Sequence, residues 1–272
     1  MKSTNEADRG RSNELSGRLA LVTGAGNGIG RGIALVLARH GADVVALDLN
    51  LALANEVAEM ARAENVRGLA VSHDVSDWDG LPGVFERVAA EAGRPVDILV
   101  NNAGIYFSTP FEELRPEQHR ALYEVNVTGV LAMCQAAVVS MRENRFGKIV
   151  NIASISGRDP FPKSASYGSS KSAVIGITKS LAKEYARSNI NVNAVCPGFV
   201  RTQMQIDQCR RLAEQTGGDE EAVWNQRVDL VPMGRAQEVE DIGEAVAFLC
   251  SERARNITGQ GLSVCGGLQM QG

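Results

Sequence analysis

The sequence has few cysteines, and none of them is spaced as a redox or zinc motif requires. There is no C-x-x-C pair, and several cysteines lie in apolar runs such as "VAFLC"; the five are Cys134, Cys196, Cys209, Cys250 and Cys265. Buried free thiols in a reducing cytoplasm explain this pattern most simply. The histidines, His40, His73 and His119, also lack metal-ligand spacing, so no metal site is expected.

Long apolar runs and blocks of like charge are also missing. No apolar run approaches the ~20 residues that span a bilayer. The start, "MKSTNEADRGRSNELSG", is polar and carries both charge signs, unlike a signal or transit peptide. The net charge of -4 without a basic block argues against nucleic acid or an anionic membrane as partner. We therefore expect a cytoplasmic protein in which residues 1–15 form a disordered extension.

What remains is typical of a packed domain in which strands alternate with helices. Hydrophobic residues make up 44% of the 272 residues, enough for a sizeable core. Short apolar runs predict seven strands, at about 18–23, 43–48, 68–74, 96–104, 147–154, 190–198 and 261–267. Amphipathic segments between them predict helices near 29–40, 51–64, 78–93, 117–143, 165–187 and 238–251.

This alternation indicates a parallel sheet that is covered by helices on both faces. The expected fold is α/β, a Rossmann-type doubly wound sheet of seven strands in a single domain over residues 16–272. Residues 199–235 interrupt the rhythm, with helix-like pieces near 203–215 and 219–228. We predict that this segment is a lid over the substrate.

A glycine-rich turn follows the first predicted strand. Gly24, Gly28 and Gly30 lie in "TGAGNGIG" with the spacing T-G-x-x-x-G-x-G. Glycines let the backbone approach a pyrophosphate, and the helix that begins near Ile29 points free N–H groups at the anion. No Lys-Ser or Lys-Thr follows, which disfavours a nucleoside-triphosphate P-loop. The turn therefore predicts a dinucleotide site.

Asp48 ends the second predicted strand. A carboxylate there can accept hydrogen bonds from a ribose 2′-hydroxyl and would repel a 2′-phosphate. No arginine follows in "LDLNLALAN", and Asn27 in the glycine-rich turn brings no charge. The sequence therefore predicts NAD(H) in preference to NADP(H).

Tyr167 and Lys171 are the i and i+4 residues of a predicted helix that begins in "SYGSSK". A nearby positive charge favours a phenolate and lowers its pKa, which is normally about 10. Such a pair could be a tuned proton donor or simply two surface neighbours. Ser154 and "NNAG" end two predicted strands, at the rim where open α/β sheets bind ligands. The pair begins a helix at that same rim, which favours the functional reading.

These motifs together resemble the short-chain dehydrogenase/reductase family over about residues 16–268. Ser154 precedes Tyr167 by thirteen residues, as in the family pattern. The matching positions are Thr23-Gly24-x-x-x-Gly28-x-Gly30, Asp74, Asn101-Asn102-Ala103-Gly104, Asn126, Ser154, Tyr167-x-x-x-Lys171 and Pro197-Gly198. The resemblance implies a catalytic tetrad of Asn126, Ser154, Tyr167 and Lys171.

Each member of the tetrad has a role that the resemblance implies. Tyr167 would be the general acid in carbonyl reduction and the general base in alcohol oxidation. Lys171 would lower the pKa of that phenol and hold the nicotinamide ribose. Ser154 would donate a hydrogen bond to the substrate oxygen. Asn126, a poor helix former, would hold a water that relays protons to Lys171, through its side chain or a displaced backbone.

The resemblance also implies a set of cofactor contacts. Asp74 and Val75 would border the adenine, Asn102 to Gly104 would line the adenosine ribose, and the segment after Pro197 would hold the carboxamide. The full set is Gly24, Asn27, Gly28, Ile29, Gly30, Asp48, Leu49, Asp74, Val75, Asn102, Ala103, Gly104, Tyr167, Lys171, Pro197, Gly198, Val200 and Thr202.

Further residues are predicted to shape the substrate pocket or to pack beside it. Tyr106, Arg158 and Phe161 lie on loops near the active rim, where they would contact substrate. Three apolar residues within or next to the predicted lid could also line the pocket or touch substrate, but packing is the favoured interpretation; they are Met204, Trp224 and Met233.

The leading hypothesis is an NAD(H)-dependent oxidoreductase acting on CH-OH groups, which interconverts a secondary alcohol and a ketone. A small polyol or hydroxyketone is favoured, because Asp48 selects NAD(H) and biosynthetic reductases commonly use NADPH. The alternative within the family is reduction of a 3-oxoacyl thioester on acyl-carrier protein or coenzyme A. Two other classes are a non-catalytic dinucleotide-binding sensor and an S-adenosylmethionine methyltransferase, which has no use for the Tyr-Lys helix. The resemblance also implies a homotetramer.

Overall fold

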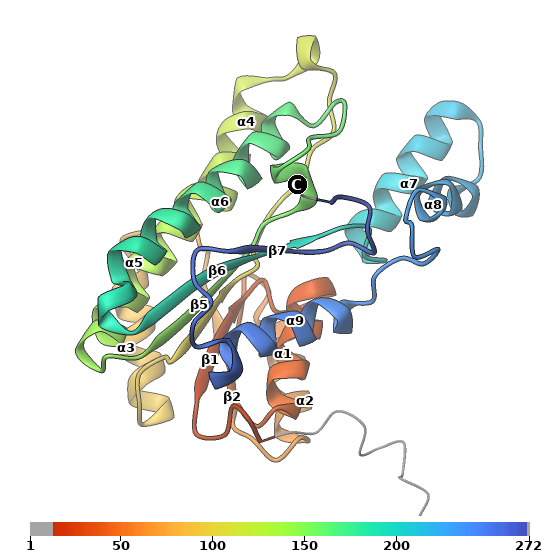
Figure 1. The fold of residues 1–272 in the computed structure, drawn as a ribbon. Helices are drawn as coiled ribbons and strands as arrows, with labels where there is room; N and C mark the ends of the chain where they lie inside the picture. Colours follow the sequence, from red (N-terminus) through yellow and green to blue (C-terminus); the bar gives the residue numbers. More distant parts are fainter. Residues whose placement is uncertain (1–12, 271–272) are drawn as a thin grey trace, which may run out of the picture.

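Seven parallel strands form one sheet in the computed structural model, which describes residues 13–270 (Figure 1). Their order is β3-β2-β1-β4-β5-β6-β7, so β2 and β3 are added on one side of β1 and β4 to β7 on the other. The strands are β1 Leu19–Thr23, β2 Asp43–Asp48, β3 Gly68–Ser72, β4 Ile98–Asn101, β5 Gly147–Ile152, β6 Ile190–Pro197 and β7 Gly261–Val264. The predicted seven-stranded, doubly wound sheet is confirmed.

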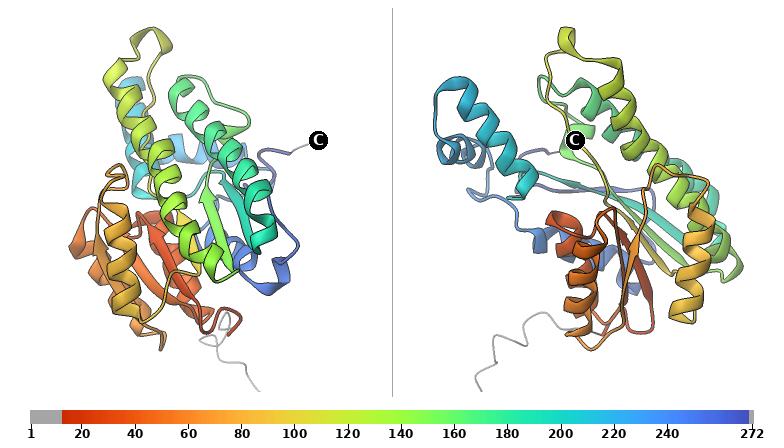
Figure 2. Two further views of the ribbon diagram at one scale, coloured as in Figure 1. Left: turned by 90° about the vertical axis from the view of Figure 1, so that its left-hand side faces the viewer. Right: turned by 180° about the vertical axis from the view of Figure 1, so that it is seen from behind.

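Helices cover both faces of this sheet (Figure 2). One face carries α1 Gly28–Arg39, α2 Leu51–Arg62 and α9 Val239–Cys250, and the other carries α3 Leu81–Ala92, α5 Gly129–Glu143 and α6 Ala165–Tyr185. Short 3₁₀ turns lie at Phe111–Glu113, Ile155–Gly157, Ala186–Ser188 and Glu252–Ala254.

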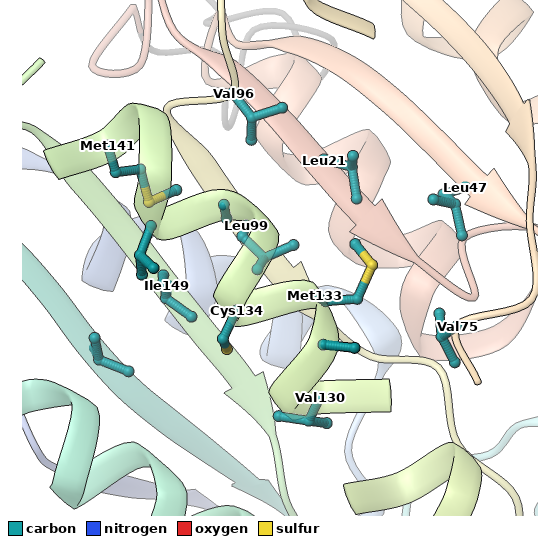
Figure 3. Close-up of a cluster of buried hydrophobic side chains, with 14 of the residues drawn as sticks. Leu21, Leu47, Val75, Val96, Leu99, Val130, Met133, Cys134, Met141 and Ile149 are labelled. Atoms are coloured by element: carbon teal, nitrogen blue, oxygen red, sulfur yellow. The ribbon is translucent and has the colours of Figure 1, made fainter. Parts of the chain in front are cut away.

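Alternate residues of the central strands enter two separate cores. In β1, Leu19 and Leu21 pack toward α3, α5 and α6, whereas Ala20 and Val22 pack toward α1, α2 and α9. Figure 3 shows part of the first core, where Met133 lies among strand side chains such as Leu21. Because successive residues of a strand point to opposite faces, a strand covered on both sides is apolar throughout. All five cysteines are buried and free, as predicted.

The long helix predicted at 117–143 is interrupted by a π-helical turn. It consists of α4 Pro116–Tyr123, the π turn Glu124–Thr128 and α5. By length and composition alone, the segment Pro116–Glu143 could cross a membrane. Half of its most apolar window is buried inside the molecule, however, because α5 packs on the sheet and supplies much of the first core.

The packed part of the chain begins earlier than residue 16, the predicted start of the domain. Leu15 is only 1% exposed, and its N–H donates to the His40 carbonyl at 2.9 Å. The prediction of a disordered extension is therefore corrected at residues 13–15, because burial of one leucine anchors them. Its remainder, residues 1–12, lies outside the described residues.

Two further helices, α7 Gln203–Thr216 and α8 Glu220–Asp229, form a lobe that stands apart from the sheet (Figure 1). We call residues 201–230 the helical lobe. It has a small core of its own, in which Trp224 packs with Cys209, Ala213 and Val223, so the predicted packing of Trp224 is confirmed. Met204 and Met233 are 44% and 66% exposed, so their predicted packing is wrong.

Candidate active site

A cavity of about 680 Å³ lies beyond the carboxyl ends of the central strands. Its walls come from the turns and loops that follow β1 to β6, from the start of α6 and from the helical lobe. All of the predicted site residues line it except Gly30 and Asn126. Motifs that are spread over most of the sequence therefore meet in one space.

The glycine-rich turn presents open backbone to this cavity. Gly28 has a φ of +53°, a conformation that side chains rarely adopt, and a Cβ there would meet nothing closer than 3.5 Å. Gly30 is needed for packing instead, because a Cβ there would lie 2.1 Å from the Gly24 carbonyl oxygen. Asn27, the N-cap of α1, makes no side-chain cap hydrogen bond, and the first turn has no acidic residue. The N–H groups of this helix end therefore suit an anion.

Thr23 and Asn102 fasten the glycine-rich turn to the loop after β4. The Thr23 hydroxyl accepts hydrogen bonds from the N–H groups of Asn102 and Ala103, each at 3.0 Å. The Asn102 amide donates to the carbonyls of Thr23 and Gly24, also at 3.0 Å. Although Asn102 lines the cavity, its side chain is thus committed to holding the turn in place.

Asp48 lies at the cavity with both carboxylate oxygens already engaged. One oxygen accepts from the Gly26 N–H at 2.9 Å and the other from the Asn50 N–H at 3.0 Å. These bonds fix the carboxylate at the end of β2, beside the exposed Leu49. After β3, Asp74 accepts from the N–H and the hydroxyl of Ser76, and these hydrogen bonds hold the pKa of that carboxyl below its ordinary value.

Asn126 lies in the π turn and is fully buried. Its side chain binds the backbone of the segment that follows β4. Its Oδ1 accepts from the Ile105 N–H at 2.8 Å, and its Nδ2 donates to the Ile105 carbonyl at 2.9 Å and to the Ser170 hydroxyl at 3.3 Å. A Cβ at Gly104 would lie 3.2 Å from Asn126 Oδ1 and 3.5 Å from Lys171 Nζ. Asn126 and Lys171 therefore flank the same glycine.

Ser154 follows β5 and starts the 3₁₀ turn that leads toward α6. Its hydroxyl accepts from the Ser156 N–H at 3.1 Å. Within that turn, a Cβ at Gly157 would lie 2.7 Å from the backbone of Lys171, so the turn packs directly on α6. This contact brings Ser154 next to the first turn of α6, where Tyr167 is placed.

Tyr167 lies edge-on to Tyr106, with ring centroids 4.8 Å apart and an angle of 75° between the rings. Burial raises the pKa of the Tyr167 phenol to about 12, although a hydrogen bond from Ser154 acts in the opposite direction. The sequence predicted that Lys171 would lower this pKa. In the structure, removal of the phenolate from water prevails, and the net shift is upward.

Lys171 is 5% exposed and donates from Nζ to the Ile152 carbonyl at 2.9 Å. Burial lowers the pKa of this ammonium to about 8, with Cys196 acting weakly in the opposite direction. Its Nζ lies 5.8 Å from the centre of the Tyr167 ring. The amine is therefore charged at neutral pH but close to its titration point.

Of the residues predicted to shape the pocket, Tyr106 and Phe161 line the cavity, and so does Met204. Arg158 does not line it, because its guanidinium is tied to Ser263 and the Gly261 carbonyl of β7. Within the described residues, no group of three His, Cys, Asp or Glu side chains could hold a metal ion.

Several cavity residues were missed, notably Lys163, Phe199, Gln205, Gln208 and Arg227. Lys163 could have been suspected, because it stands in the same loop as Phe161 and four residues before Tyr167. The other missed residues lie just after β6 and in the helical lobe. No sequence motif in these segments indicates which side chains face the cavity.

Known proteins resemble this chain over nearly its full length. A family model described as enoyl-(acyl carrier protein) reductase matches residues 24–269. The chain is 37% identical over 259 residues to the oxidoreductase UcpA of Salmonella typhimurium, covering 93% of this chain and 95% of that protein. It is also 37% identical over 259 residues to the 3-oxoacyl-[acyl-carrier-protein] reductase FabG of Escherichia coli, covering 94% and 99%. A crystal structure of an NAD+-bound xylitol dehydrogenase superposes with a TM-score of 0.88 at 32% identity, covering 93% of this chain and 99% of that one.

Proposed function

Because the chain belongs to the short-chain dehydrogenase/reductase family of oxidoreductases, we propose that it interconverts a secondary alcohol and a ketone with NAD(H). One observation carries the proposal. Tyr167 and Ser154 lie on the same cavity as the glycine-rich turn and Asp48. A dinucleotide and a small carbonyl compound could therefore meet beside a phenol and a serine hydroxyl.

The residues at the dinucleotide end suit a nicotinamide dinucleotide. The open N-terminus of α1 would bind the pyrophosphate, and the fixed Asp48 carboxylate would accept hydrogen bonds from a ribose 2′-hydroxyl. The resemblance to an NAD+-bound xylitol dehydrogenase supports the same choice. When bound, the nicotinamide supplies or accepts the hydride.

The side chains at the opposite end of the cavity would donate the proton and stabilise the negative charge that develops on the substrate oxygen. With a pKa of about 12, the Tyr167 phenol is protonated at neutral pH and is ready to donate to a ketone oxygen. Ser154 would donate a hydrogen bond to the same oxygen as negative charge develops there. The buried ammonium of Lys171 would then offset the charge of the resulting phenolate.

Asn126 is a positioning residue in this proposal. Both N–H groups of its amide are used by Ile105 and Ser170, so its side chain has no donor left for a water. A proton relay to Lys171 would therefore run through the backbone of the π turn, where the helical hydrogen-bond pattern is displaced.

Two substrate classes remain in competition. A small polyol or hydroxyketone is favoured, because Asp48 points to NAD(H) and because the chain resembles a xylitol dehydrogenase. A 3-oxoacyl thioester is the second candidate, supported by the 37% identity to FabG, which is named as a 3-oxoacyl-[acyl-carrier-protein] reductase. Purified protein assayed for NADH consumption and NAD+ reduction over both classes distinguishes them. Binding of NADH without any turnover would instead favour a sensor.

Assembly and location are part of the same proposal. We propose a homotetramer in which the helices of Pro116–Glu143 and Ala165–Tyr185 pair across a two-fold axis. On α5, Val139 is 61% exposed and Leu131 is 37% exposed, which supports burial of this surface in an assembly. A monomer in light scattering at micromolar concentration would contradict this assembly.

The five free thiols favour a reducing compartment such as the cytoplasm.

The two directions of the reaction should respond differently to pH. Oxidation needs the phenolate of Tyr167, whose pKa is about 12, so kcat/KM for an alcohol should rise about tenfold per pH unit from pH 6 upward. Above about pH 8 the slope should fall, because Lys171 loses its charge there. Ketone reduction needs the phenol and should not rise with pH. Initial rates in both directions between pH 6 and 10 test this, and a flat oxidation profile would be inconsistent with it.

Substitution of Asp48 tests the cofactor preference. Asp48→Asn removes the charge but keeps an oxygen that can accept from Gly26 or Asn50. The preference for NAD+ over NADP+ in kcat/KM should fall about 10- to 100-fold, the value of a charge-assisted hydrogen bond and of the lost repulsion. Asp79→Asn is the matched control, because this exposed aspartate does not line the cavity. An unchanged preference in Asp48→Asn would show that the ribose is recognised elsewhere.

A further inference from the structure

Two basic side chains, Lys163 and Arg227, line the cavity at the loop before α6 and in the helical lobe. The acidic side chains that line it among the described residues are Asp48, which ends β2, and Asp74, which follows β3, and both lie at the proposed dinucleotide end. The end of the cavity next to Tyr167 and the lobe therefore carries positive charge without a carboxylate to balance it.

Arg227 contacts amide oxygens in place of carboxylates. Its Nη1 donates to Oε1 of Gln205 and, at 3.4 Å, to Oε1 of Gln208. Within residues 13–270, its Nη2 and Nε have no protein acceptor and it forms no ion pair. A guanidinium presents its donors as a planar fork that fits a carboxylate or phosphate. The unused edge of this fork is suited to such a group.

Two other arginines of the helical lobe form ion pairs with its glutamates, so the lobe does contain carboxylates that can pair with an arginine. Arg201 pairs with Glu221 at 2.6 Å, and Arg210 pairs with Glu220 at 3.0 Å. Those pairs lie outside the cavity, and Arg227, which lines it, is left without one. Arg211 also has no ion pair among the described residues, but it is exposed outside the cavity, so Arg227 is the unpaired arginine of the lobe that a ligand in the cavity can reach.

Gln208 supplies an independent observation. Its Nε2 is buried and has no hydrogen-bond partner within the described part of the chain. Buried donors are normally satisfied, so this unpartnered amide beside the cavity would gain an acceptor from a ligand if the side chain turned toward it. Gln208 accepts from Arg227 through Oε1, so its amide group lies beside the guanidinium.

An apolar surface joins this place to the phenol. The Arg227 guanidinium lies 5.8 Å from the centre of the Phe199 ring, which stacks on Phe161 at 5.9 Å. Phe161 belongs to the loop that leads into Tyr167. A substrate could therefore lay a short carbon chain on the two rings, between the arginine and the tyrosine.

Lys163 lies in that loop in a left-handed conformation, with a φ of +62°. Such a φ is uncommon for lysine and favours glycine or asparagine. The Thr109 N–H donates to its carbonyl at 2.9 Å and helps to hold the loop. A lysine kept in an unfavourable backbone conformation at the cavity rim is consistent with a use for its charge.

We propose that the substrate carries an anionic group, a carboxylate or a phosphate, which Arg227 binds with Gln208 and Lys163 while the reacting carbonyl faces Tyr167. The proposal rests on the proposed function and narrows its substrate class. Among hydroxyketones and polyols, it selects acids and phosphate esters over neutral compounds.

Binding of a probe that cannot be reduced tests the anion site without any turnover. Calorimetric titration of the NAD+-loaded protein with malonate should show binding, and neutral malonamide should not bind. In Arg227→Gln, malonate should bind about 10- to 100-fold more weakly, because a charge-assisted fork of hydrogen bonds is lost. Equal binding of malonate to the wild type and to Arg227→Gln would overturn the proposal.

Two matched pairs of ketones identify the anion by kinetics. Acetoacetate is compared with methyl acetoacetate, and dihydroxyacetone phosphate with dihydroxyacetone. The anionic member of one pair should have a kcat/KM about 10- to 100-fold higher, mainly through KM, and this ratio should approach one in Arg227→Gln. Preference for the neutral members in the wild type would overturn the proposal. Malonate binding with no turnover of any ketone would count against the proposed reaction and support the anion site.

Two further variants separate a ligand role from a structural one. Arg211→Gln is the matched control, because Arg211 is exposed on the same lobe, does not line the cavity and should leave both ratios unchanged. Lys163→Asn keeps a residue that tolerates the left-handed backbone and removes the charge, so the anionic preference should fall with no loss of stability. If Arg227→Gln weakened NAD+ binding and left malonate binding intact, the arginine would serve the cofactor and the proposal would be wrong.

Discussion

Tyr167→Phe is expected to lose turnover by about 10³-fold in both directions, because it removes the proton donor and acceptor and little else. The phenylalanine ring keeps the edge contact with Tyr106, whose centroid lies 4.8 Å away. Binding of NADH, followed by fluorescence, should therefore remain near that of the wild type. Steady-state rates with the best substrate found in the panel give the size of the loss.

The control for this variant is Tyr185→Phe. Tyr185 ends the same helix, α6, and does not line the cavity. The same loss of a hydroxyl there should leave the rate unchanged. Near-normal turnover in Tyr167→Phe would remove the phenol from the mechanism, whereas loss of NADH binding together with turnover would indicate a damaged site.

Lys171→Met is expected to abolish turnover and at the same time to stabilise the protein. In the folded protein, burial lowers the pKa of Lys171 from 10.5 to about 8. A difference of this size corresponds to roughly 3 kcal/mol of unfolding free energy lost at neutral pH, since one pKa unit is about 1.4 kcal/mol. Loss of the hydrogen bond to the Ile152 carbonyl offsets about 1–2 kcal/mol of the gain. A rise of several degrees in Tm remains.

The sign of this effect also predicts how stability depends on pH. Between about pH 8 and 10.5 the unfolded chain still binds the proton that the folded chain has lost, so the unfolding free energy of the wild type should rise with pH. Lys171→Met should not show this rise. Calorimetry at pH 7 and pH 9 measures it, with the exposed Lys179→Met as the control. A lower Tm for Lys171→Met at pH 7 would mean that the buried charge is well compensated.

The strands could be predicted from the sequence because burial on both faces leaves a simple pattern. β1 and β2 are apolar except at terminal residues, and their predicted ends agree with the structure to within one residue. The third strand was predicted to reach residue 74 but ends at Ser72. The Asp74 carboxylate accepts hydrogen bonds from the N–H and the hydroxyl of Ser76. Such local side-chain bonds compete with the hydrogen bonds of a sheet, and the hydrophobic pattern does not reveal them.

The π turn around Asn126 could not be predicted, because a π turn and an α-helix share the same apolar pattern. The direction of the pKa shift of Tyr167 escaped prediction for a related reason. Sequence spacing shows that a lysine lies near a phenol, but it does not show how far both are removed from water. The motifs predicted which residues would form the site, and burial sets the direction in which the pKa values of Tyr167 and Lys171 shift.

Arg227 is a cavity residue that could not be predicted from the sequence. It follows Tyr167 by sixty residues in a segment without a motif, so only the packing of α7 against α8 brings it to the cavity. Loops and lobes that carry specificity vary freely because the fold does not depend on them. For the same reason they leave little trace in a single sequence.

The helical lobe fills its interior with its own Trp224 cluster, and at its base a bridge between Val200 and Gln237 clamps it to the body of the molecule. The lobe is therefore a nearly independent packing unit. Under the proposed function, changes in this lobe would alter which substrates the cavity admits, and the residues proposed to bind the dinucleotide and to transfer the proton would stay the same.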